Sequence, residues 1–304
     1  MTKNDLEIWK ALYIDRFDTH KYLYHYTSFE AAIRILYGNT LLFGKLSNAN
    51  DITESKIRIS YENSADTPNK QYYKECKTIT DYLIGEKDGF QILCFSMDTC
   101  VKERKKSNYL QNIMGNEAYY DVSGRGFALP RMWAQYANDH KGLCLIFNKD
   151  TLIEKVKSER SFFKAGPVKY KDILSTYHIK EKQVNSLFNK IKNESNGNLP
   201  YLTAMKNTDF LNYNFFEKSS DWSNEQEYRI IIYTNSRESE RQQISNISDA
   251  IEGIVYGERM DEIYKEVLSI FFKKLFKKNK NIHNKDINER IKQICFNEYI
   301  CRLK

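Results

Sequence analysis

Residues 22–38 constrain the fold most, because an alternating pattern there runs directly into a helix start. Tyrosines alternate with Leu23, His25 and Thr27, and this period of two predicts a strand over residues 22–27. Thr27-Ser28-Phe29-Glu30 then matches a capping box, so a helix is expected to follow and to end at Gly38. A strand end beside a helix N-terminus favours an anionic ligand such as a pyrophosphate near His25 and Thr27. The alternative is that His25 is a structurally satisfied histidine.

The rest of the chain mixes strand and helix patterns without regular alternation. Further strands are expected at 40–46, 90–97, 142–147, 225–234 and 253–256. Helices are expected at 5–17, 68–85, 131–136 and 149–156, over most of 170–220, and in two amphipathic segments after residue 261, the second carrying Ile287, Ile291 and Ile294. No internal repeat is visible.

This mixture predicts an α+β domain with a helical C-terminal addition. We expect one domain over residues 1–260, with insertions at about 98–128 and 170–220. Residues 261–304 are expected to form a basic helical C-terminal extension.

Composition excludes several classes of protein. Hydrophobic residues make up 41% and aromatic residues 14% of the chain, which is typical of a globular protein rather than a disordered one. The longest apolar runs are only as long as strands, so no membrane partner is expected. The six cysteines form no C-x-x-C pair, which favours reduced thiols, a cytoplasmic location and no bound metal.

The formal net charge is +7, and the excess lies near the C-terminal end. A basic patch of this kind could bind the phosphates of DNA or RNA. The candidate contacts are Lys273, Lys274, Lys277, Lys278 and Lys280. The alternative is that these lysines fill the solvated outer face of a docked helix.

Two further clusters carry polar or aromatic side chains that could do chemistry. Trp133 and Tyr136 lie three residues apart on an expected helix, where they form either a wall for a flat ring or part of the core. On an extended segment Glu225, Glu227 and Arg229 would share one face. Two carboxylates and a guanidinium suit the stabilisation of a cationic transition state. The alternative is an exposed edge whose charges pair with one another.

A nuclease is a separate hypothesis, because it would need a cluster of carboxylates that binds a metal. Asp51, Glu54, Glu225 and Glu227 could form one only if the fold brings the loop after the second strand beside the late strand.

Several segments together resemble the bacterial family called domain of unknown function 2971. They are Leu23–Ser28, Asn50-Asp51, Leu93–Ser96, Met132–Tyr136, His140–Gly142, and Lys218 with Asp221–Arg229. They occur in the expected order over about residues 22–260. One departure is Ile52, since that family usually has proline after Asn-Asp.

A more distant resemblance is to ADP-ribosyltransferases, notably the DarT-type DNA-modifying toxins. Tyr24–Thr27 with the following helix is similar to their opening NAD-binding motif, and Glu225-x-Glu227 is similar to their catalytic glutamate motif. The resemblance implies that Glu227 bonds the ribose of the nicotinamide half and that Glu225 orients the acceptor. The residues implied to bind NAD are His25, Tyr26, Thr27, Ser96, Trp133 and Tyr136.

The first resemblance implies no function. The second implies an ADP-ribosyltransferase-like fold with a mixed-sheet core and helical insertions. It also implies an enzyme that uses NAD as a substrate, modifies a macromolecule and acts as a toxin or anti-phage defence effector. An antitoxin or a sensor protein would then be a partner. A near variant is an NAD glycohydrolase with water as the acceptor. The alternatives are a nucleic-acid-binding or sensing module without catalysis, and a nuclease.

Overall fold

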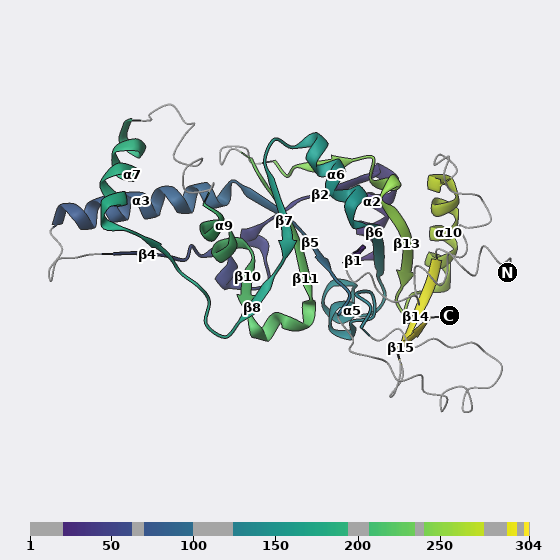
Figure 1. Cartoon of the computed structure of the whole chain (residues 1–304). Coiled ribbons are helices and arrows are strands. Elements are labelled where there is room, and N and C mark those ends of the chain that lie inside the picture. The colour runs from purple at the N-terminus through teal and green to yellow at the C-terminus, as the bar shows by residue number, and fades with distance from the viewer. Residues whose placement is uncertain are drawn as a thin grey trace.

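The computed structural model of the protein describes residues 21–62, 70–99, 124–193, 207–234, 240–276, 291–296 and 301–303. The helix predicted at 5–17 and most of the insertion predicted at 98–128 lie outside these residues. Helices surround a mixed sheet (Figure 1), so the predicted α+β class is confirmed.

One sheet runs through the centre of the described chain. Its strands, in order across the sheet, are β15 (Cys301–Leu303), β14 (Ile291–Phe296), β13 (Ile251–Tyr256), β6 (Leu143–Asn148), β1 (Tyr22–Thr27), β5 (Phe90–Ser96), β11 (Glu227–Tyr233) and β7 (Phe163–Pro167). The short strand β3 (Gly44–Lys45) also pairs with β5. Neighbours are antiparallel except β13 and β14, which are parallel.

Shorter strand pairs lie outside this sheet. They are β2 (Thr40–Leu42) with β12 (Gln243–Ser245), β4 (Ile59–Tyr61) with β9 (Tyr177–Ile179), and β8 (Lys169–Lys171) with β10 (Glu217–Ser219). The α-helices are α2 (Phe29–Gly38), α3 (Lys70–Asp88), α5 (Pro130–Tyr136), α6 (Lys149–Glu159), α7 (Glu181–Asn193), α9 (Thr208–Phe215) and α10 (Glu262–Phe276). Short 3₁₀ turns occur at Leu46–Asn48, Ile52–Ser55, Ser220–Glu225 and Ile247–Asp249.

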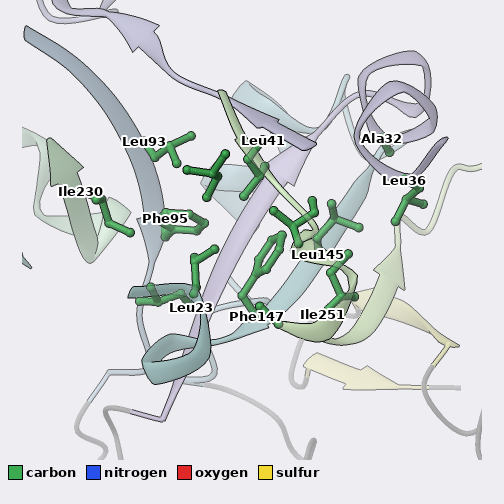
Figure 2. Packing of buried hydrophobic residues seen from close by; sticks show 14 of the residues in the cluster. Leu23, Ala32, Leu36, Leu41, Leu93, Phe95, Leu145, Phe147, Ile230 and Ile251 are labelled. Atoms are coloured by element: carbon green, nitrogen blue, oxygen red, sulfur yellow. The ribbon is translucent and has the colours of Figure 1, made fainter. Parts of the chain in front are cut away.

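Hydrophobic residues cover both faces of the central sheet. On one face, Leu23, Phe95 and Ile230 pack with residues of α2 and α6, and Figure 2 shows this cluster. On the other face, residues of α3 and α9 form a cluster with residues of β5 and β11, α7 packs against α3, and α5 packs against the tyrosines of β1. Because the side chains of β1 alternate between the two faces of the sheet, as predicted, this one strand contributes residues to both hydrophobic cores.

The turn from β1 into α2 differs from the predicted capping box by one residue. Ser28, not Thr27, is the N-cap, and its hydroxyl accepts a 3.2 Å hydrogen bond from the Ala31 amide. The helix ends where Asn39 adopts a left-handed conformation with φ of 52°. The capping-box motif thus predicted the position of the helix correctly, although the N-cap is Ser28.

One prediction of helical structure is wrong, and a second is incomplete. Residues Ile291–Phe296 form strand β14, which pairs in parallel with β13, so the C-terminal extension is not wholly helical. The segment 170–220 contains β8, β9 and β10 besides α7 and α9. The apolar spacing of Ile291 and Ile294 also suits a strand, because isoleucine favours strands once a neighbouring edge is available for pairing.

Two strand predictions need new bounds. The segment 40–46 divides into β2 and β3 and then continues as a 3₁₀ turn. Strand β11 begins at Glu227, because Gln226 is left-handed with φ of 47° and ends the preceding turn. Glu225 therefore lies in that turn and not in the strand.

In the part of the chain that is described, no helix is both long and apolar enough to cross a lipid bilayer.

Candidate functional site

The central sheet opens between β1 and β5. These strands pair at a single position, Tyr24 with Ser96, and β3 takes over the same edge of β5 at Ile92 and Gln91. Between these positions the carbonyl oxygen of Cys94 on β5 contacts the His25 ring, with Nδ1 at 3.2 Å, in place of a backbone N–H from a neighbouring strand. A cavity of about 360 Å³ occupies this opening, and we call it the β1–β5 cavity.

Most of the residues predicted to bind or act on NAD come together at this cavity. Its lining includes His25, Tyr26, Ser96, Tyr136, Glu225 and Glu227. They arrive from β1, β5, α5 and the segment that enters β11. Residues far apart in the sequence therefore share one concave site, which is the usual form of a small-molecule site.

A buried ionic cluster forms the wall of the cavity beside β11. Its members are Glu54, Lys218, Glu225, Glu227 and Arg229, and none of these side chains is more than 6% exposed. The Lys218 Nζ lies 2.7 Å from Glu225 Oε2 and 3.5 Å from a carboxylate oxygen of both Glu54 and Glu227. Three carboxylates thus surround one ammonium group.

The Arg229 guanidinium joins the same cluster from the neighbouring position on β11. Its Nε and Nη2 donate to the two oxygens of Glu227 at 2.6 and 2.8 Å. Nη2 also contacts Glu54, and Nη1 donates to the Phe215 carbonyl oxygen at 2.8 Å. This planar fork fixes the orientation of the Glu227 carboxylate, as bidentate arginine pairs do.

Charge holds Glu227 in its ionised form. Burial opposes ionisation, but the charges and hydrogen bonds of Arg229, together with Lys218, outweigh it and lower the pKa of Glu227. The backbone N–H of Glu227 also donates to the Tyr170 hydroxyl at 2.8 Å. At neutral pH Glu227 is therefore an ionised, ion-paired carboxylate in the wall of the cavity.

Glu225 is oriented from the opposite side by α5. The Tyr136 hydroxyl donates to Glu225 Oε1 at 2.7 Å and accepts from the Asn50 side-chain amide at 3.0 Å. Burial and the adjacent Glu225 carboxylate raise the pKa of Tyr136 far above its usual value, so the phenol stays protonated and donates. Asn50, Tyr136 and Glu225 thus form a hydrogen-bonded chain.

His25 belongs to the opposite face of the sheet from Glu227. Its ring lies 5.6 Å from the ring of Phe95, in the core that α2 covers, while Glu227 and Arg229 face α9. Loss of solvation lowers the pKa of His25, although the hydrogen bond to Cys94 opposes this, so the imidazole is neutral at pH 7. The cavity is thereby lined from both faces of the sheet.

Cys94 is the most accessible nucleophile in the cavity. It is exposed at the centre of β5, directly opposite Arg229 in the ladder. The surrounding protein withdraws its thiol from bulk water, and this desolvation, with the Glu227 carboxylate, raises the pKa of Cys94 well above its usual value. The group is therefore a protonated thiol that bonds Glu227 rather than a thiolate.

Two residues predicted to bind NAD lie outside the cavity lining. Trp133 is fully buried, donates through its ring nitrogen to the Phe127 carbonyl oxygen at 2.7 Å and packs edge-on against Tyr26. Thr27 is buried at the end of β1 opposite Leu143. Of the predicted aromatic pair, Tyr136 reaches the cavity and Trp133 belongs to the core, as the alternative interpretation held.

The predicted nucleic-acid contacts are only partly within the described chain. Lys273 and Lys274 belong to α10. Lys277, Lys278 and Lys280 lie outside the described residues.

The fold brings the loop after β3 beside the start of β11, which was the condition for the nuclease hypothesis. Glu54 approaches Glu225 and Glu227, but Lys218 and Arg229 stand between these carboxylates and neutralise them in part. Among the described residues no group of three or more histidine, cysteine, aspartate or glutamate side chains is arranged to hold a metal ion. The geometry favours an ion-paired wall over a metal site.

Sequence reasoning on the residues alone missed several members of the site. Lys218 and Asn50 are named only among the segments of the family resemblance, and Glu54 is named only as a possible metal ligand in the nuclease hypothesis. Each is polar in a loop or a short strand, so periodicity gives no signal for it. What they share is their location in the fold, because they approach the start of β11 from β10 and from the loop after β3.

Comparison with known proteins gives one match. Residues 132–230 match the family described as "Protein of unknown function (DUF2971)". No curated protein and no solved structure matches the chain. The matched stretch begins on α5 and ends within β11, so it contains Tyr136, Lys218, Glu225, Glu227 and Arg229. The chain is thus similar to the DUF2971 family over residues 132–230, which include most of the ionic wall of the cavity.

Proposed function

We propose that the chain is an NAD-consuming enzyme that cleaves the bond between nicotinamide and ribose in the β1–β5 cavity and transfers ADP-ribose to a macromolecule or to water. The observation that supports this most directly is the meeting of Glu227, Glu225 and His25 in one cavity of about 360 Å³. A volume of this order suits a small-molecule ligand.

The chemistry needs a negative charge beside the ribose. When the bond between C1′ and the nicotinamide nitrogen breaks, the electron pair leaves with nicotinamide and positive charge develops on the ribose ring. A buried, preorganised carboxylate stabilises such an oxocarbenium-like state. Glu227 is suited to this role because Arg229 holds it ionised and immobile.

The surroundings of the ionic cluster support the same role. Lys218 and Arg229 pair with Glu54, Glu225 and Glu227, and the nearby charge of Arg58 also acts on Glu54. Glu227 is thus a buried carboxylate held in place by fixed charges. The positive charge that develops in the transition state would meet it there.

Glu225 is placed to serve the acceptor. An oxygen nucleophile that attacks C1′ forms the new glycosidic bond and must lose its proton, and the Glu225 carboxylate can take that proton. Its two oxygens are held in place by hydrogen bonds, Oε1 from the Tyr136 hydroxyl and Oε2 from the Lys218 ammonium group, both at 2.7 Å. Substituting Tyr136→Phe should therefore impair transfer while leaving the ion pairs of the wall intact.

The proposal is tested by incubating the purified protein with NAD labelled on its adenylate side, with and without cell extract and added DNA or RNA. Nicotinamide release together with label on a macromolecule supports a transferase and identifies the acceptor class. Release with free ADP-ribose supports a glycohydrolase. No nicotinamide release in any mixture overturns the proposal.

The role as a toxin or defence effector is part of the proposal and has its own test. Induced expression in a bacterial host should lower cellular NAD or label a macromolecule, and growth should slow. Expression of Tyr136→Phe at the same level should be much less harmful. Equal growth of both strains with unchanged NAD and no label overturns the toxic role.

A further inference from the structure

We propose that Lys45 and Arg241 form an anion subsite of the β1–β5 cavity that binds the phosphate groups of its ligand. Both residues line this cavity. Within the described residues neither has a hydrogen-bond or ion-pair partner, so their charges are available to a ligand. The inference rests on the proposed function for the identity of the ligand, a dinucleotide, but the basic pair is defined by the structure.

A buried glutamine holds the two cations together. Gln91 is 1% exposed and lies directly opposite Lys45 in the pairing of β5 with β3. Its side chain donates to the Glu240 carbonyl oxygen at 3.0 Å and accepts from the Gln242 amide at 2.8 Å. Arg241 is thus held on both sides by one side chain, and its backbone is fixed beside Lys45.

Two further contacts fasten the same segment, one to Phe43 between β2 and β3 and one to Arg160 at the end of α6. The Phe43 amide donates to the Gln242 carbonyl oxygen at 2.8 Å, and the Arg160 guanidinium donates to the Gln242 side chain at 3.1 Å. Two like charges are therefore held near one cavity by several hydrogen bonds. Cations kept together in this way are stabilised when an anion binds between them.

The cavity is polarised along β5. Lys45 pairs at Gln91, whereas Glu227 pairs at Ser96 five residues farther along the strand. At the usual rise of a strand this corresponds to about 17 Å. Lys45 also shares the face of Gln91, while Glu227 lies on the opposite face with Cys94 and Arg229. A ligand that used both ends would be elongated, with an anionic group well separated from a cationic one.

NAD carries both kinds of charge, with one ribose between its cationic nicotinamide ring and its anionic pyrophosphate. This is shorter than the separation of about 17 Å along β5. With the ring at Glu227, the phosphates would therefore lie between the two ends, and the long side chains of Lys45 and Arg241 would reach back toward them. The Lys45 ammonium and Arg241 guanidinium would donate charge-assisted hydrogen bonds to the phosphate oxygens. Gln91 is then a positioning residue of the subsite.

The test is calorimetric titration of the full chain with ADP-ribose, and with adenosine as the ligand that lacks phosphate. The double variant Lys45→Gln/Arg241→Gln should bind ADP-ribose about 10- to 100-fold more weakly than the wild type. It should also lose the salt dependence of that binding, while adenosine binding stays unchanged. Arg34→Gln/Lys77→Gln is the control, because it removes the same charge from exposed positions outside the cavity lining.

The outcomes test the anion subsite separately from NAD cleavage. Equal ADP-ribose affinity and equal salt dependence in the wild type and the cavity variant overturn the subsite, even if the protein releases nicotinamide from NAD. Loss of affinity in the control variant to the same extent also overturns it. Tight, Lys45- and Arg241-dependent binding by a protein that releases no nicotinamide keeps the subsite and rejects the catalytic proposal. Absence of ADP-ribose binding in the wild type rejects the subsite.

Discussion

Arg229 binds both carboxylate oxygens of Glu227, with Nε to Oε1 at 2.6 Å and Nη2 to Oε2 at 2.8 Å, although the two residues lie only two positions apart on β11. Side chains at this spacing share one face of a strand, so the pair forms without any contribution from a loop. The fork fixes the carboxylate plane toward the β1–β5 cavity.

Replacing Arg229→Lys should lower the rate of NAD cleavage by about 10-fold or more, although the charge is kept, because an ammonium group cannot reproduce the planar two-bond contact. The free energy of unfolding should also fall, since the Phe215 carbonyl oxygen loses its donor. Steady-state nicotinamide release and denaturant unfolding measure the two effects. Unchanged kcat in a folded Arg229→Lys protein would show that the fork does not position Glu227.

The Glu227 ion pairs should make stability depend on acid pH. The pKa of Glu227 is lower in the folded chain than its usual value of 4.5. The stabilisation is therefore fully present above pH 4.5 and is lost as the pH falls through the folded-state pKa. Denaturant unfolding from pH 7 to pH 3 should show the difference between the wild type and Glu227→Gln narrowing below pH 4.5. A difference that stays constant over this range contradicts the ionised state of Glu227.

The thiol of Cys94 should report on Glu227. Desolvation and the Glu227 carboxylate both raise the pKa of Cys94, so Glu227→Gln removes one cause and leaves Arg229 free to stabilise the thiolate. Alkylation of Cys94 by iodoacetamide at pH 8, followed by peptide mass spectrometry, should be several-fold faster in this variant. Glu217→Gln, which changes a buried glutamate outside the cavity lining, should leave the rate unchanged. Slower or equal alkylation in Glu227→Gln would contradict this arrangement.

Lys87 should contribute a different pH dependence, on the alkaline side. It is buried at the end of α3, and desolvation, together with the nearby charge of Arg58, lowers its pKa to about 7. Above pH 7 the unfolded chain binds the proton more tightly than the folded chain, so stability rises with pH until about 10.5. The free energy of unfolding should therefore increase relative to Lys87→Met by up to about 1.4 kcal/mol per pH unit. A difference between the two proteins that is flat from pH 7 to pH 10 would contradict the lowered pKa.

Sequence patterns predicted the elements that local chemistry determines. The alternation in β1 and the capping signal after it located a strand and a helix, and the glutamates near β11 were identified from their spacing. The pattern failed where pairing with a distant strand decides the structure. Ile291 and Ile294 fit a helix face and a strand equally well, and the parallel edge of β13 selects the strand.

The cavity itself could not be predicted from periodicity. It depends on β5 pairing with β1 at Ser96 and with β3 at Ile92, which leaves the edge open at Cys94. The sequence of β5 itself does not indicate that its pairing partner changes from β1 to β3. The ionic wall is similar, since Glu54 and Lys218 reach Arg229 or Glu227 only through the tertiary fold.

The strand at the C-terminal end also changes how the lysines of α10 should be tested. Deleting residues 273–304 would remove β14, a partner of β13, together with the basic charge. Charge reversal at Lys273 and Lys274 separates nucleic-acid binding from the integrity of the sheet. Salt-dependent binding of DNA or RNA that survives reversal would show that these two lysines are not the contact.

The most direct test of the central claim is the rate of nicotinamide release from NAD by three proteins: the wild type, Glu227→Gln and the control Glu217→Gln. Both variants neutralise a buried, ion-paired glutamate, so both are expected to lose stability, and the rates are compared under conditions in which all three are folded. We predict that Glu227→Gln lowers the rate by about 100-fold or more, as expected for loss of a preorganised charge at the transition state, while Glu217→Gln stays near the wild-type rate. Absence of release by the wild type, or equal rates in folded wild type and Glu227→Gln, would contradict the account.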